Sequence, residues 1–97
     1  SIDMRAASAR LTVVIGEKEE WGKGLGKEAV ERMVRYAFNV LNLHRVHVIV
    51  AEHNDRALAC FGSCGFVREG TLRHDHYHRG SYRDSHVMSV LRDEGST

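Results

Sequence analysis

The chain passes from a strand to a helix through Ile15-Gly-Glu-Lys-Glu-Glu-Trp-Gly-Lys-Gly-Leu-Gly-Lys-Glu-Ala29. The residues before this stretch, Leu11–Ile15, are mostly β-branched and stop at Gly16, which predicts a strand. Beyond the glycines, apolar residues stand at positions 25, 29, 30, 33, 34, 37, 38 and 41. That spacing predicts one helix over residues 25–41 with a single apolar face.

Further elements follow through short connections. Val46–Ala51 is almost continuously apolar, which predicts a strand buried on both faces. Either Asn54 or Asp55 can cap a second helix that runs to about Cys64, and Gly65 can end it in the left-handed conformation.

The last third of the chain predicts a hairpin. Residues 66–78 are extended and alternate in polarity, and Arg79-Gly80 supplies a turn. Tyr82–Leu91 then returns as the hairpin partner of residues 66–78. Residues 92–97 are polar and predict a frayed tail. The order β-α-β-α-β-β predicts an α/β fold in which helices pack on a mixed sheet, within one domain over residues 1–97.

Composition sets limits on partners. The 97 residues are 42% hydrophobic and 28% charged, and their net charge is +1 with histidine neutral. Without a strong basic or acidic excess, neither nucleic acid nor a membrane is an expected partner. No apolar run is long enough to span a bilayer. Two cysteines, Cys60 and Cys64, make no disulfide framework, which suits a reducing cytoplasm.

The glycine loop predicts a site for phosphate. Gly22, Gly24 and Gly26 allow the backbone to approach a ligand closely, and Lys23 and Lys27 add positive charge. The first turn of the following helix offers amides without partners and the positive end of the helix dipole. The spacing G-x-G-x-G matches neither the dinucleotide-binding nor the nucleotide-triphosphate pattern. A flexible turn that merely starts a helix is the alternative.

Several motifs together resemble the GNAT superfamily of N-acetyltransferases. The loop resembles that family's acetyl-CoA loop, and three later stretches also fit: Leu43-His-Arg-Val46, Asn54-Asp-Arg-Ala57 and Cys64-Gly-Phe-Val67. They are similar to the branch that contains the ribosomal-protein N-terminal acetyltransferases. The resemblance spans about residues 8–91 and leaves out nearly all of the family's N-terminal part. It therefore implies an N-terminally truncated GNAT-like fold, and Ser1-Ile2-Asp3 would be internal to a longer protein.

The resemblance implies a cofactor site and an activity. The cosubstrate would be acetyl-CoA, and its acetyl group would pass to a primary amine of a small molecule or a protein N-terminus. Backbone of Val14, Ile15 and Gly16 would pair with the pantetheine arm, and Asn54 would contact the cofactor near it. The amides that would hold the pyrophosphate are those of Gly22, Lys23, Gly24, Leu25, Gly26 and Lys27.

Two positions depart from the family pattern. Many members carry a tyrosine as general acid seven residues after the asparagine, where this chain has Phe61, and some carry a glutamate base where it has Ile49. Glu17, Glu52 and His53 are weak candidates for the acid–base role, with solvated surface residues as the alternative. A second hypothesis is therefore a catalytically idle module that binds acetyl-CoA or oligomerises.

Three alternating histidines mark the hairpin. On a regular strand His74, His76 and His78 would share one face, and His-x-His pairs can bind metal. The preferred interpretation is a face that lines the acceptor channel or a dimer edge, with no metal. Tyr77 and Tyr82 could also line this channel or an interface, or simply pack.

The missing N-terminal part carries one more expectation. Without it, one side of strand 11–15 would be an unpaired edge, and exposed core would favour self-association into a homo-oligomer. The identity of the amine acceptor stays open at this level.

Overall fold

The computed structural model describes residues 2–6, 10–15 and 26–95. Its strands are β1 (Ile2–Ala6), β2 (Arg10–Ile15), β3 (Arg45–Ala51), β4 (Val67–His78) and β5 (Ser81–Leu91). Its helices are α2 (Lys27–Arg35), which continues as a π-helical turn over Tyr36–Val40, α3 (Asp55–Ser63) and the short α4 (Arg92–Gly95). The predicted order β-α-β-α-β-β is confirmed, with one further strand in front of it.

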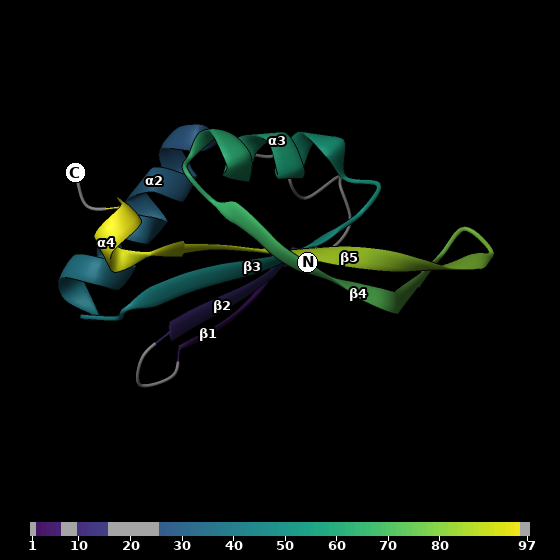
Figure 1. The fold of residues 1–97 in the computed structure, drawn as a ribbon, viewed down its shortest axis with the longest axis horizontal. Coiled ribbons are helices and arrows are strands. Elements are labelled where there is room, and N and C mark those ends of the chain that lie inside the picture. Colours follow the sequence, from purple (N-terminus) through teal and green to yellow (C-terminus); the bar gives the residue numbers. More distant parts are fainter. Residues whose placement is uncertain (1, 7–9, 16–25, 96–97) are drawn as a thin grey trace.

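The five strands form one mixed sheet in the order β1-β2-β3-β5-β4. Strands β2 and β3 run parallel and are connected through α2, whereas the other neighbouring pairs are antiparallel. Figure 1 shows α2 and α3 on the same side of this sheet, while the β4–β5 hairpin extends beyond the helices.

Strand β1 corrects the prediction of an open edge. It pairs antiparallel with β2 along its whole length, from Ile2 opposite Ile15 to Ala6 opposite Leu11. The prediction was wrong because Ile2–Ala6 is short and contains charged residues, which makes the sequence signal for a strand weak. The edge strands of the sheet are therefore β1 and β4.

The core lies between the sheet and the two helices. Leu11, Val13 and Ile15 stand opposite Val46, Val48 and Val50, and all six side chains are buried. The helices contribute buried residues to the same cluster, namely Val30, Val34, Ala37, Phe38, Ala57 and Phe61. The other face of β3 carries Arg45, His47 and Ile49, which are only partly buried, so the prediction of two buried faces holds for one face.

Helix α3 has the ends predicted for it. The Asn54 side chain caps its first turn, and Gly65 follows its last turn with φ of +93°, a conformation that glycine adopts without strain. The prediction of a frayed tail over residues 92–97 was wrong for its first residues. Arg92 begins α4, its backbone amide donates to the His44 carbonyl at 2.9 Å, and its guanidinium donates to Asn42 Oδ1.

Candidate functional site

The parallel pair β2–β3 ends where the glycine loop begins. Ile15 is opposite Val50 on one side and opposite Ile2 on the other, so its backbone lies inside the sheet. The predicted roles of Gly16, Glu17, Gly22, Lys23, Gly24 and Leu25 lie outside the described residues, and those of Val14 and Ile15 stay predictions.

The start of α2 is described and has the form an anion site needs. Gly26 is its N-cap, with extended backbone and no side chain to bond the first amides. Those amides therefore have no capping partner on the N-cap residue, and the helix dipole adds positive potential beside them. A depression of about 350 Å³ lies here, lined by Gly26, Glu28, Ala29 and Arg32. A methyl group added at Gly26 would meet open space.

Asn54 stands at the other end of the candidate site, at the start of α3. Its side chain is only 4% exposed. Oδ1 accepts a hydrogen bond from the Ala57 amide at 3.3 Å, but Nδ2 is buried and has no hydrogen-bond partner in the described part of the chain. Buried amide donors are normally satisfied, so Nδ2 is available to donate to a ligand that reaches it.

Helix α3 lies between Asn54 and the start of α2 at Gly26. At its C-terminal end, the Cys64 thiol lies 3.8 Å from the Lys27 carbonyl at the start of α2. Its N-terminal end carries Asn54, and nine helical residues rise about 14 Å. An elongated ligand could therefore place phosphates at Gly26 and its other end near Asn54.

A histidine cluster lies beside Asn54. The rings of His53 and His78 stack with centroids 4.1 Å apart, and the His76 ring lies 5.5 Å from that of His53. The Nδ1 atom of His76 is 3.2 Å from the Ser85 hydroxyl oxygen. This places residues of the β3–α3 connection, β4 and β5 at one end of α3.

His74 does not join this cluster, which corrects the prediction of one shared face. The register of β4 against β5 shifts between Leu72 and His76, and His74 has φ of +52°. The ring of His74 instead stacks on Tyr82 at 5.7 Å. Among the described residues, no group of three or more histidine, cysteine, aspartate or glutamate side chains could hold a metal ion.

The candidate Glu52 has a structural partner, and Phe61, which stands where many members carry a tyrosine, is buried. Glu52 is exposed, and its Oε2 accepts a hydrogen bond from the Asp84 amide at 2.7 Å, which ties β3 to β5. Phe61 is 1% exposed and packs edge-on against Phe66, with ring centroids 5.1 Å apart. The structure thus places His53 in the histidine cluster beside Asn54, whereas Glu52 makes a structural contact with β5. Ser85 and Arg83 also belong to this region, and no local motif in the sequence could have indicated them.

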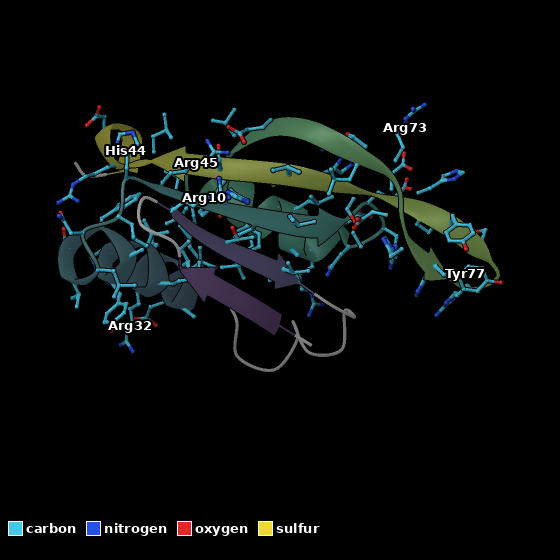
Figure 2. All side chains as sticks on the ribbon, turned by 90° about the horizontal axis from the view of Figure 1, so that it is seen from below. Arg10, Arg32, His44, Arg45, Arg73 and Tyr77 are labelled. Atoms are coloured by element: carbon cyan, nitrogen blue, oxygen red, sulfur yellow. The ribbon has the colours of Figure 1, made fainter. Side chains whose placement is uncertain are left out.

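The face of the sheet that carries no helix among the described residues has a charge pattern of its own. Arg10 and Arg45 are opposite each other on β2 and β3, as Figure 2 shows, and Arg45 forms a two-pronged ion pair with Glu69. This pair raises the pKa of Arg45 and lowers that of Glu69. Beside it, burial and then the two arginines hold the pKa of His47 below its ordinary value.

Comparison with known proteins gives a consistent picture. Residues 1–67 match the family model described as the acetyltransferase (GNAT) domain. The chain is 33% identical over 87 residues to spermidine N(1)-acetyltransferase from Vibrio cholerae, covering 90% of this chain and 50% of the relative. It is 35% identical over 77 residues to a putative ribosomal N-acetyltransferase from Bacillus subtilis, covering 79% of this chain and 42% of the relative.

Solved structures agree with these sequence matches. The crystal structure of spermidine N-acetyltransferase from Vibrio cholerae in complex with CoA and spermine superposes with a TM-score of 0.81 at 28% identity, covering 99% of this chain and 59% of that one. A dodecameric structure of the Vibrio cholerae enzyme gives a TM-score of 0.70 at 33% identity, covering 87% of this chain and 48% of that one. The chain spans about half the length of the curated relatives it matches.

Proposed function

We propose, because the chain belongs to the GNAT acetyltransferase family, that it binds acetyl-CoA and transfers the acetyl group to a primary amine. The observation that carries the proposal is the buried Asn54 Nδ2, which has no described hydrogen-bond partner at one end of α3, together with the Gly26 N-cap of α2 near the other end. The α2 amides beside Gly26 would receive the pyrophosphate, and Asn54 Nδ2 would donate to the amide-bearing arm of the cosubstrate. When bound, acetyl-CoA supplies the activated acyl group.

The chain's own part in the reaction is positioning. Holding the amine and the thioester in one orientation can supply much of the rate enhancement. An oxyanion would form as the amine attacks, and backbone amides are the usual donors that stabilise it. Since Phe61 carries no hydroxyl, a proton for the leaving thiolate would come from solvent or from another side chain.

A second candidate is an idle module that binds acetyl-CoA without turnover. It is favoured by Phe61, which is buried and has no proton to give, and by the partly buried Ile49 where some members carry a glutamate base. Both candidates share the cosubstrate site, and they differ only in chemistry.

Two measurements separate the candidates. Calorimetric titration with acetyl-CoA tests the shared site, and absence of binding at millimolar ligand would reject both. Thiol release is then measured with a panel of amines and peptides bearing free N-termini. Release above the rate without acceptor supports the enzyme, whereas binding without release supports the idle module.

The remaining proposals concern the assembly of the protein, its location and its domain organisation. The relative from Vibrio cholerae has a dodecameric structure, and we propose that this chain also self-associates. No described helix is long and apolar enough to cross a membrane. We propose action in the cytoplasm as part of a single acetyltransferase domain.

A further inference from the structure

Arg83 and His76 face each other across the β4–β5 hairpin. His76 stands directly opposite Arg83 in the antiparallel register, so both side chains project from the same face of the sheet. Directly opposed residues have Cβ atoms about 5 Å apart. One small ligand can therefore contact both side chains.

Each of these residues has a buried nitrogen without a partner. Nε of Arg83 and Nε2 of His76 are both buried and make no hydrogen bond to any described residue. Nδ1 of His76 already lies 3.2 Å from the Ser85 hydroxyl. If that hydroxyl donates to Nδ1, the ring proton stands on Nε2, and the pair presents two N–H donors.

In the described part of the chain, no carboxylate forms an ion pair with Arg83. Asp84 Oδ1 accepts a hydrogen bond from the His74 amide, and Glu52 Oε2 accepts one from the Asp84 amide. Glu69 is paired with Arg45. Leaving a partly buried guanidinium without a counter-ion is costly, and a fork of N–H donors matches a carboxylate.

The His76–Arg83 pair lies near the Asn54 end of the candidate site. His76 contacts the ring of His53, which directly precedes Asn54, whereas Gly26 and Lys27 lie beyond the other end of α3. About 14 Å of helix separates the pair from the place proposed for the pyrophosphate. Its ligand is therefore distinct from the phosphates of the cosubstrate.

We propose that His76 and Arg83 bind a carboxylate of the acceptor, so that the preferred acceptor is an amine that carries an acid group and not a polyamine. The inference rests on the proposed function for the reaction, but the carboxylate site itself does not require turnover. A polyamine would bring only positive charge to Arg83, and its binding would leave both nitrogens unsatisfied.

Lysine and cadaverine form a matched pair of probes, because they differ by a single carboxylate. The first measurement follows the Nε–H resonance of Arg83 by nuclear magnetic resonance as each probe is added. We expect lysine to shift it with saturation and cadaverine to leave it unmoved. A resonance that responds to neither probe, or equally to both, overturns the proposal.

The second measurement compares kcat/KM for the two probes. Loss of a charge-assisted pair of hydrogen bonds should cost about ten- to a hundredfold, so Arg83→Gln should remove the preference for lysine by that factor, mainly through KM. Arg83→Lys should restore part of it. An unchanged ratio in Arg83→Gln, or binding of acetyl-CoA with acetylation of neither probe, also overturns the proposal.

Controls separate this inference from the proposed function. Arg73 lies on the same hairpin and is exposed, and Figure 2 shows its side chain pointing away from the molecule, so Arg73→Gln should leave the ratio unchanged. Calorimetry must show that Arg83→Gln binds acetyl-CoA as the parent does. If the parent binds no acetyl-CoA, the proposed function fails while the Arg83 resonance still reports the carboxylate site. A peptide with an acidic second residue tests whether the carboxylate comes from a protein acceptor.

Discussion

Asn54 divides two roles between the two polar atoms of its side chain. Oδ1 caps α3 through the Ala57 amide, and Nδ2 remains buried without a described partner. The first role belongs to stability, because an asparagine cap satisfies an amide that the helix cannot. The second belongs to binding, because a buried donor gains most from a ligand that it can reach.

Substitutions at Asn54 should separate these roles. Asn54→Ala should lower the free energy of unfolding by about 1 kcal/mol and also weaken acetyl-CoA binding. Asn54→Ser keeps an oxygen that can cap the helix, so it should retain stability while binding weakens. Urea unfolding and calorimetry measure the two effects. Full binding by the serine variant would contradict the role assigned to Nδ2.

His47 predicts a dependence of stability on pH. Burial, Arg45 and Arg10 lower its pKa in the fold, whereas an unfolded imidazole titrates near about pH 6.5. Between the two pKa values the unfolded chain binds more protons, so the free energy of unfolding falls as pH drops through this window. The urea midpoint measured from about pH 8 down to about pH 5 should follow this fall. His47→Gln should flatten it, and an identical slope in the variant would contradict the account.

At the scale of elements, the sequence predicted α3 well and the β4–β5 hairpin incompletely. A capping residue and a closing glycine are local signals, so the sequence alone narrowed the cap to Asn54 or Asp55 and assigned Gly65, and the structure selects Asn54. The register shift between Leu72 and His76 depends on pairing with β5 and on the contacts of distant residues. Alternation along the strand therefore placed His74 on the wrong face, and the pairing of His76 with Arg83 could not be foreseen.

Phe61 anchors α3 to the sheet, and its removal measures that contact. The side chain is 1% exposed and meets Phe66 edge-on. Phe61→Ala should lower the free energy of unfolding by about 3–5 kcal/mol, which is a large share of the stability of a small domain. The exposed Val67→Ala, on the neighbouring strand, should cost far less. Denaturant midpoints for the two variants test this ranking, and equal midpoints would contradict it.

At the scale of the whole molecule, one face of the sheet has no helix over it among the described residues (Figure 1). Val14, Ile49 and Val87 form a row of directly paired residues on this face, and each is partly exposed. The sequence suggested self-association for a different reason, the supposed open edge of β2, which β1 in fact covers. The apolar row gives the proposal a new basis, because exposed apolar patches favour association.

Light scattering tests this proposal directly. We expect a mass of at least two chains at micromolar concentration, and Val14→Lys should lower it by placing a charge in the apolar row. Thr12→Lys is the matched control, since Thr12 lies two residues earlier on the same strand and face but outside the row. A parent chain that stays monomeric throughout this range would contradict self-association.

The central claim is that the start of α2 and the start of α3 together bind acetyl-CoA, and calorimetric titration tests it most directly. The parent chain should bind, and Gly26→Ala should keep the fold, because a methyl group at this position meets no described atom within 4 Å. Gly26→Glu should abolish binding by placing a carboxylate where the pyrophosphate is expected, while circular dichroism shows the fold intact. Absence of binding by the parent at millimolar acetyl-CoA, or undiminished binding by Gly26→Glu, would contradict the account.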